Sequence, residues 1–381
     1  MTRDRVVVVG AGVAGVAVAR ALARSFDVTV LERAEVGGGA TGVSAGLIAP
    51  TLFYGDLPAV ARFANRAVRA VDGAGAFSFT ERPRIDVVSR AEVADARRRA
   101  RELADEGFPV AYLEREAVER RFGRLDLSRF AGAVCYEDTG WVDPYTYAVT
   151  LAELAEDGGV RVETGVRVSG LVVDGGSVAG VETDDGRHEA DAIVLAAGWR
   201  TPELMPGDTA LPVRPYRTQC LVLEPDPPLD EDVPLGRVSG EGLYFRPEHS
   251  GRILVGGGAH ECRNPEAASR RPDEAFTDSV ATIVPRLFDG VDGAGLVTGW
   301  AGFDAATPDA RPLIGRIPGG PENLLVATGF NGLGVMIGPI AGPIVREHLG
   351  GSSAPFPTDP FAPDRFGDVA TTFDLRSTSD V

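Results

Sequence analysis

Three glycines and one acidic residue near the start of the chain have the types and spacing of a phosphate- and ribose-binding site. Gly10, Gly12 and Gly15 share one short segment, and Glu32 follows 17 residues after Gly15. The first glycine permits a tight turn, the second lets the backbone approach a pyrophosphate, and the third lets a helix pack closely on a strand. A carboxylate at Glu32 can accept hydrogen bonds from two ribose hydroxyls and disfavours a 2′-phosphate. The pattern therefore indicates a site for FAD or NAD rather than NADP.

The elements that must position these residues follow one another in the required order. Residues 6–9 predict a buried parallel strand, residues 16–24 a helix, and residues 28–31 a second strand that ends at Glu32. The amides at the start of the helix, around Val13 and Ala14, would attract phosphate groups. The alternative is a glycine-rich turn in another kind of α/β protein.

A second loop of small residues covers 33–48 and ends in an apolar segment. Its glycines and hydroxyl-bearing residues can run against a flat cofactor or a second phosphate with little steric hindrance. The alternative is a flexible linker. The residues expected to contact the cofactor here are Arg33, Ala40, Thr41, Ser44, Ala45 and Gly46.

The composition excludes some classes of partner. The chain has 381 residues, 44% of them hydrophobic, which is enough for a sizeable core and two domains. The net charge is −17, and all 38 basic residues are arginine, since no position is lysine. Such a chain is a poor partner for nucleic acid, which needs a basic face. The acidity fits a salt-rich cytoplasm; the alternative is a GC-rich genome that favours arginine codons.

The cysteines indicate a reducing compartment. Cys135, Cys220 and Cys262 are far apart and show no metal-ligand spacing, so we expect neither a metal site nor a disulfide framework. The charged residues 1–5 lead directly into the first strand, so we expect no signal peptide. Residues 6–23 are long enough to suggest a membrane span, but their glycines and Arg20 fit the dinucleotide motif better. We expect a cytoplasmic protein without a transmembrane segment.

The rest of the chain alternates between α/β and antiparallel character. Helices are expected at 58–72, 91–106, 144–158, 273–288 and 334–349, the third with Asp143 as its N-cap. Strands are expected at 85–88, 160–163, 166–173, 178–183, 191–199, 213–223, 243–246, 253–256, 296–301 and 323–329. Residues 350–381 are rich in Pro, Ser and Asp and predict an exposed tail.

Seven segments in order resemble the D-amino-acid oxidase-like family of FAD-dependent oxidoreductases, which includes glycine oxidase, monomeric sarcosine oxidase and D-amino-acid dehydrogenase. They are residues 10–15 with Glu32, 39–46, 140–144, 196–198, 212–219, 307–315 and 327–334. The resemblance covers nearly the whole chain and implies hydride transfer from a substrate C–H bond to FAD.

The resemblance also implies an architecture. A Rossmann-like FAD-binding domain, with a parallel sheet and an antiparallel hairpin, would comprise 1–55, 142–210 and 305–381. An interleaved α+β substrate domain on a mixed or antiparallel sheet would comprise 56–141 and 211–304. Some relatives tether the flavin through a cysteine where this chain has Gly302, so FAD is expected to be non-covalent.

The same resemblance extends the set of expected cofactor contacts. The turn that opens the last helix would aim its amides at the negative charge of the reduced flavin, and the alternative is an ordinary strand–helix connection. Val168 could equally belong to the core. The expected contacts are Val168, Ala197, Gly198, Arg311, Gly329, Asn331, Gly332, Leu333, Gly334 and Val335.

The substrate end departs from the relatives. Asp304 stands where glycine-oxidase-like members have an arginine that holds the substrate carboxylate. Two carboxylates would repel each other in a dry site, so another arginine takes over or the substrate has no carboxylate there. Arg217 is the candidate we single out, with Arg214 and Arg246 as further possibilities. Asp304 could instead hold a substrate ammonium or form an ion pair within the protein.

Two further residues are catalytic candidates. Tyr244 lies on an expected strand where related enzymes place an aromatic hydroxyl over the flavin, and the alternative is simple packing. His260 follows a strand that should enter the pocket and could act as a general base, and the alternative is a surface histidine.

We therefore expect an FAD-dependent oxidase or dehydrogenase that takes a hydride from a small amine, most plausibly a D- or N-alkyl amino acid, to give an imine or keto product. The alternatives are an FAD-dependent 2-hydroxy acid dehydrogenase and a flavin-binding protein without catalysis. The electron acceptor, whether oxygen, a quinone or a carrier, stays open. Some relatives use a lysine to promote oxygen reduction, so the lysine-free sequence favours a dehydrogenase.

Overall fold

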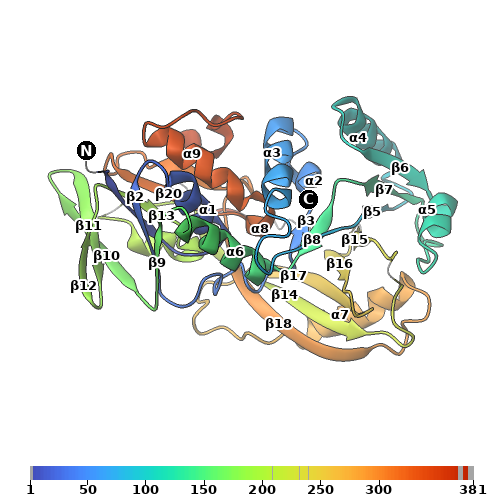
Figure 1. Cartoon of the computed structure of the whole chain (residues 1–381). Helices are drawn as coiled ribbons and strands as arrows, with labels where there is room; N and C mark the ends of the chain where they lie inside the picture. The colour runs from blue at the N-terminus through green and yellow to red at the C-terminus, as the bar shows by residue number, and fades with distance from the viewer. Residues whose placement is uncertain (1–2, 208, 231, 239, 368–371, 376–381) are drawn as a thin grey trace.

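A computed structural model describes residues 3–207, 209–230, 232–238, 240–367 and 372–375 of the chain. Two large sheets organise the molecule, with smaller sheets beside them (Figure 1). The first has six strands in the order β19-β20-β13-β1-β2-β9, and all of its pairs are parallel except β19 with β20. Its strands are β1 (Arg5–Val9), β2 (Asp27–Glu32), β9 (Arg161–Thr164), β13 (Ala192–Leu195), β19 (Leu313–Arg316) and β20 (Leu324–Thr328).

Both faces of this six-stranded sheet are covered. Alternate residues of β1 point to opposite faces, so Val6 and Val8 enter one hydrophobic core and Val7 and Val9 another. The helices that pack together on the first side are α1 (Val13–Leu22), α6 (Pro144–Glu156) and α9 (Ala341–His348). The second core includes residues of a small antiparallel sheet of β10 (Val168–Asp174), β11 (Ser177–Thr183) and β12 (Gly186–Glu189). Burial on both faces explains the unbroken valine run.

The second large sheet has eight strands in the order β18-β14-β17-β16-β15-β5-β7-β6. Its pairs are antiparallel except β15 with β5, which is parallel and joins two distant parts of the chain. The strands are β5 (Arg84–Val88), β6 (Val110–Glu114), β7 (Gly132–Tyr136), β14 (Arg214–Glu224), β15 (Leu235–Val238), β16 (Leu243–Pro247), β17 (Ile253–Glu261) and β18 (Gly295–Ala306). Helix α7 (Glu274–Ile283) packs on one face.

Short elements connect the two large sheets. A three-stranded sheet consists of β3 (Leu47–Ile48), β8 (Gly140–Val142) and β4 (Phe79–Glu81). The remaining helices are α2 (Pro50–Tyr54), α3 (Pro58–Arg69), α4 (Val93–Asp105), α5 (Arg115–Arg121) and α8 (Gly334–Ile337). Asp143 caps α6 as expected, because its side chain accepts a hydrogen bond from the Thr146 amide. In the described part of the chain, no helix combines the length and the apolar character of a membrane span.

The expected fold class is confirmed, since a mainly parallel sheet with helices and a hairpin stands beside a mixed sheet. All strands of the six-stranded sheet come from the segments assigned to the FAD domain, and those of the eight-stranded sheet lie in the other segments, except that β18 continues to Ala306. The domain boundaries themselves stay a prediction.

The expected helix at 334–349 is wrong as a single element. A 3₁₀ turn at Gly338–Ile340 separates α8 from α9. Pro339 lacks the amide that a continuous α-helix would need, which accounts for the break. Several strands were not predicted at all, among them β7. All of its residues are buried, so its sequence lacks the alternation of polar and apolar residues that indicates a strand.

The expected exposed tail is wrong where the segment packs on the core, at Phe356, Phe361 and Pro363, whereas residues 350–353 are exposed as expected. Phe361 is completely buried, and its ring lies 6.2 Å from that of Tyr54. Arg365 donates a hydrogen bond of 2.8 Å from Nε to Asp309, so the segment is held by both packing and charge. Residues 368–371 and 376–381 of the expected tail lie outside the described residues.

Replacing Phe361 with alanine should therefore lower the free energy of unfolding by roughly 3–5 kcal/mol, because a buried aromatic ring is lost and a cavity remains. Urea-induced unfolding followed by circular dichroism measures this. Ser352→Ala, at an exposed position of the same segment, is the matched control and should change the value by less than about 0.5 kcal/mol. Equal stability of the two variants would show that the segment does not pack on the core.

Candidate active site

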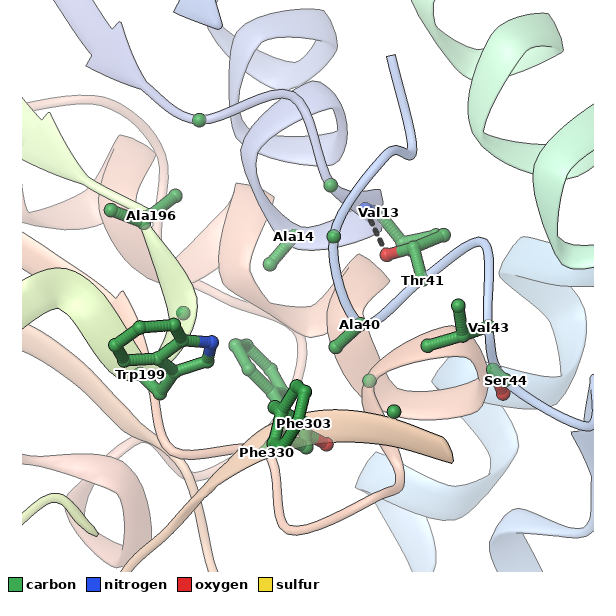
Figure 2. Close-up of a pocket in the computed structure, with 18 of the residues that line it drawn as sticks. Val13, Ala14, Ala40, Thr41, Val43, Ser44, Ala196, Trp199, Phe303 and Phe330 are labelled. Carbon is green, nitrogen blue, oxygen red and sulfur yellow. Dashed lines mark hydrogen bonds between the residues drawn. The ribbon is translucent and has the colours of Figure 1, made fainter. Parts of the chain in front are cut away.

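A cavity of about 590 Å³ extends between the two large sheets. One end lies at the carboxyl ends of β1, β2 and β13, where the strand order of a parallel sheet leaves a crevice for ligands. The other end is walled by β14, β15, β16 and β18 of the eight-stranded sheet. Figure 2 shows the first region, with Thr41 and Ser44 of the second glycine loop on one side and Ala196 and Trp199 on the other.

The first glycine turn has the close approaches that its sequence predicts. Gly10 has a φ of +107°, and a Cβ there would lie 2.5 Å from the Ala196 carbonyl oxygen. A Cβ on Gly15 would lie 2.0 Å from the carbonyl oxygen of Gly10, so this residue sets the contact between helix and turn rather than lining the cavity. Gly12 does line the cavity, and a Cβ there would meet only the Thr41 hydroxyl, at 3.2 Å.

The amides at the start of α1 are available to an anion. Val13 donates to the Thr41 hydroxyl at 3.2 Å, a contact drawn in Figure 2. The amides of Gly12, Ala14 and Gly15 have no hydrogen-bond partner among the described residues. No acidic residue lies in the first turn of the helix. The positive end of the helix therefore faces the cavity without a competing carboxylate.

Glu32, which was expected to bind a ribose, also stabilises the backbone around the glycine turn. Its two carboxylate oxygens accept hydrogen bonds from the amides of Ala11 and Ala34, at 2.9 and 3.0 Å. Glu32 lines the cavity, and each oxygen keeps a second lone pair. The ribose contact stays a prediction, and the carboxylate also holds the glycine turn against β2.

The second glycine loop takes part in the cavity wall. The expected contacts Arg33, Ala40, Thr41, Ser44 and Ala45 all line it. Gly46 does not, because it has a φ of +70° and a Cβ there would lie 2.0 Å from the Val142 carbonyl oxygen. The indole of Trp300 donates to the Val43 carbonyl at 2.8 Å and ties the loop to β18. These bonds are at odds with a flexible linker.

The expected contacts in the last third of the chain divide into two groups. Val168, Ala197, Gly198, Gly332, Leu333, Gly334 and Val335 line the cavity. Arg311, Gly329 and Asn331 do not, since they build the turn behind it. Arg311 pairs with Asp56, a Cβ on Gly329 would lie 2.3 Å from a methyl carbon of Thr307, and the Asn331 side chain accepts the Thr307 amide at 2.8 Å.

Asp304 changes the expected role of the final turn. Its Oδ2 accepts the Gly332 amide at 2.7 Å and its Oδ1 accepts the Ala305 amide at 2.7 Å. The Leu333 amide donates to Phe330, so the amides of Gly334 and Val335 are the ones without a backbone acceptor in the described structure. The expectation that Gly332 would donate to the flavin conflicts with this geometry. The Gly332 amide already donates its hydrogen bond to the Asp304 carboxylate.

Asp304 lines the cavity and has no ion-pair partner among the described residues, so the expectation of an ion pair within the protein is wrong. Burial raises the pKa of Asp304, while the two amides act against that rise. A partner cation from a ligand would favour the ionised form.

Tyr244 also lies in the cavity wall, in register with Arg237 on β15 and Gly256 on β17. A Cβ on Gly256 would lie 2.2 Å from the Tyr244 ring, so the glycine makes room for the ring to lie across the sheet. Burial raises the pKa of Tyr244 well above its usual value, which keeps the hydroxyl protonated and able to donate.

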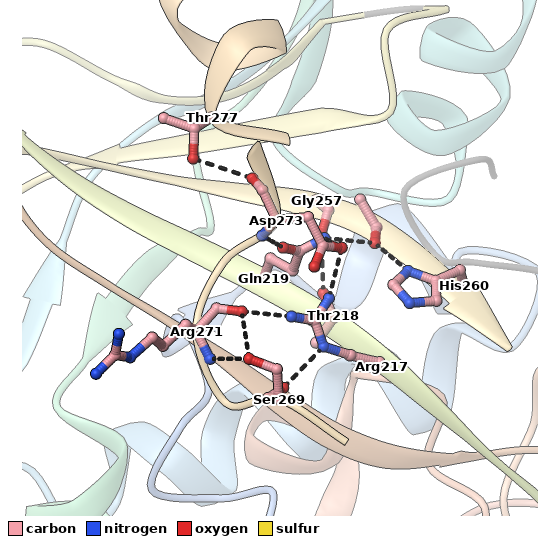
Figure 3. A network of polar contacts seen from close by, with 10 residues as sticks. Arg217, Thr218, Gln219, Gly257, His260, Ser269, Arg271, Asp273 and Thr277 are labelled. Carbon is pink, nitrogen blue, oxygen red and sulfur yellow. Dashed lines mark hydrogen bonds and ion pairs between the residues drawn. The ribbon is translucent and has the colours of Figure 1, made fainter. Parts of the chain in front are cut away.

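Arg217 and His260 are not among the residues that line the cavity. Figure 3 shows the network of polar contacts to which both belong instead. Tyr216 and Thr218 line it, and alternation along β14 points Arg217 to the opposite face. There Arg217 is 3% exposed and donates to Asp273 at 2.8 Å and to the Ser269 carbonyl at 3.0 Å. His260 is exposed, and its Nδ1 lies 3.2 Å from the Gly258 carbonyl oxygen. Arg217 therefore anchors the start of α7, and neither position supports the expected catalytic role.

Among the polar residues of the wall that sequence reasoning did not single out are three on the eight-stranded sheet. Arg84 on β5 and Arg237 on β15 line the cavity, and so does Cys220 on β14. Arg84 begins a strand that was expected, but only the parallel pairing of β5 with β15 brings it near Arg237. A pairing between segments about 150 residues apart cannot be predicted from the residue pattern of a single sequence.

Comparison with known proteins gives this architecture a family. The model of the family described as "FAD dependent oxidoreductase" matches residues 5–348. The chain belongs to that family. It is 27% identical over 378 residues to the glycine oxidase of Pseudomonas putida, covering 94% of this chain and 98% of that relative. It is 29% identical over 261 residues to the bifunctional protein ThiO/ThiG of Synechocystis sp., of which it spans only 38%.

Among solved structures, L-proline dehydrogenase from P. horikoshii superposes on this FAD-dependent oxidoreductase with a TM-score of 0.86 at 24% identity, over 96% of this chain and 98% of that one. The fold expected from the resemblance is thereby confirmed, and so is FAD as the cofactor of the family.

The site fits FAD. The cradle at Gly12 has room that a side chain would fill, unpaired amides face it, and the cavity continues to the amides of Gly334 and Val335. When bound, FAD supplies the acceptor for a hydride from the substrate. The protein supplies position, exclusion of water and charge.

Replacing Gly12 with valine should remove FAD without unfolding the protein, because the added atoms point into the cavity and meet only a hydroxyl. The ratio of flavin to protein absorbance after purification measures the loss, and circular dichroism checks the fold. Gly123→Val, at an exposed glycine with open space around it, is the matched control and should keep its flavin. Full flavin content in the Gly12 variant would rule out this cradle.

FAD should also be released by acid. Cys220 is the one described cysteine in the cavity wall, and burial raises the pKa of its thiol to about 11, so little thiolate exists to attack a flavin. After acid precipitation the yellow colour should stay in the supernatant. Colour retained in the wild-type pellet but lost from that of Cys220→Ser would reveal a covalent bond.

Proposed function

We propose that this FAD-dependent oxidoreductase oxidises the amine of a small amino acid, of the D- or N-alkyl kind. The substrate loses a hydride from carbon and a proton from nitrogen, and an imine forms that water converts to a keto acid and an amine. The observation that carries the proposal is the single cavity that joins the dinucleotide cradle to the polar wall of the eight-stranded sheet. The similarity to a glycine oxidase over nearly the full length of both chains supports the substrate class.

Some residues of the cavity wall exclude water, and others supply polar groups that can contact a substrate. Phe303, Phe330 and Trp300 supply apolar surface next to the cavity. The neutral hydroxyl of Tyr244 can donate a hydrogen bond to a substrate or product oxygen. Asp304 has no ion-pair partner among the residues that the structure describes, so its carboxylate is available to attract an ammonium group.

Anaerobic incubation with separate panels of D-amino acids, N-methyl amino acids and 2-hydroxy acids tests the proposal. At least one amino acid should bleach the flavin absorption band with saturation, whereas the hydroxy acids should leave it unchanged. Bleaching by hydroxy acids alone would instead assign oxidation at a C–O bond. A flavin that none of the three panels reduces would point to a binding protein without catalysis.

Reoxidation of the reduced protein tests the electron acceptor. The chain has no lysine to promote oxygen reduction, so we expect slow reoxidation on admission of air and fast reoxidation by an artificial quinone. Stopped-flow recovery of the flavin band gives both rates. Recovery in air that is faster than recovery with the quinone would identify an oxidase.

A further inference from the structure

One row of side chains crosses the eight-stranded sheet on the face that the cavity touches. Arg237 on β15 is in register with Asp86 on β5 and with Tyr244 on β16. Arg84 precedes Asp86 by two residues, so both project from the same face of β5. Arg84, Arg237 and Tyr244 all line the cavity.

Neither arginine is fully satisfied within the protein. Arg84 is 2% exposed, and its Nε donates to Oδ1 of Asp86 at 3.0 Å, while its two terminal nitrogens have no hydrogen-bond acceptor among the described residues. Nη2 of Arg237 lies 3.7 Å from Oδ2 of Asp86. The Nε of Arg237 is buried without a partner. Two guanidinium groups therefore share one carboxylate and retain unused donors.

The charge of this cluster has a definite sign. Two arginines and one aspartate leave a surplus of one positive charge in a buried place, which is costly without a counter-ion. The other charged residues of the cavity wall lie around the dinucleotide end, apart from Asp304, which belongs to β18 at the other edge of the sheet. The cluster thus has room for one anion and presents the donors that a carboxylate accepts.

We propose that Arg84 and Arg237 hold the carboxylate of the substrate, in place of the arginine that is missing at Asp304. The inference rests on the proposed amino acid oxidation and assigns its substrate an acidic group bound at β5 and β15. Asp86 keeps the two guanidinium groups oriented, and the Phe53 ring, whose centroid is 5.9 Å from the Arg84 guanidinium carbon, limits their movement.

Titration of the FAD-loaded protein with propionate tests this without turnover, because propionate carries the carboxylate but no oxidisable amine. It should perturb the flavin spectrum with saturation, and the uncharged isostere propionamide should not. In Arg237→Gln and Arg84→Gln the dissociation constant for propionate should rise about tenfold or more, since charge-assisted hydrogen bonds are lost. Arg84→Lys, which keeps the charge, should recover part of the affinity.

Arg246 offers a matched control. It is also a buried arginine of the same sheet, with two guanidinium nitrogens that lack partners, but it stacks on Trp141 and is not among the residues that line the cavity. Arg246→Gln should leave the dissociation constant for propionate unchanged.

The outcomes separate this inference from the proposed function. If an amino acid bleaches the flavin while both glutamine variants bind propionate like the wild type, the arginine subsite is wrong and the amine oxidation stands. If propionate binding depends on both arginines but no amine bleaches the flavin, the subsite stands and the amine oxidation fails. If the variants lose FAD on purification and, once reloaded with FAD, bind propionate like the wild type, the arginines serve the cofactor and the inference is overturned.

Discussion

The contact between α1 and the first glycine turn is the constraint on which the cofactor end depends. A Cβ on Gly15 would lie 2.0 Å from the Gly10 carbonyl oxygen, and one on Gly10 would lie 2.5 Å from the Ala196 carbonyl oxygen. Real side chains cannot occupy such positions without moving the backbone. Because helix and strands approach so closely, the first amides of α1 open directly into the crevice between β1 and β13.

The substrate end depends on alternation and register rather than on a single turn. In β14, Tyr216, Thr218 and Cys220 face the cavity, and Arg217 faces the other way and anchors α7. The register between the strands extends this wall across the sheet. Gly256 pairs with β14 and lies opposite Tyr244, and Tyr244 lies opposite Arg237. Because Gly256 has no side chain, the Tyr244 ring can lie across the neighbouring strand.

Groups of opposite charge lie at separate places along the cavity wall. The positive N-terminus of α1 faces the cavity and is available to an anion, and Asp304 presents a carboxylate at β18. The Gly332 amide donates to Asp304 and thereby connects the final turn to β18 of the eight-stranded sheet. On the far strands, Arg84 and Arg237 share Asp86 and leave donors unused.

The sequence by itself determined the dinucleotide cradle, the order of its strands and helix, and the family, because these features depend on residues that are close together in the chain. Gly10, Gly12 and Gly15 can be interpreted one after another, since the backbone between them has few ways to fold. Only the tertiary structure decided which arginines reach the cavity. Arg217 was favoured from its strand and faces away, whereas Arg84 and Arg237 meet through a parallel pairing of β5 with β15. A contact of that kind depends on the register between distant strands, and local residue patterns do not encode it.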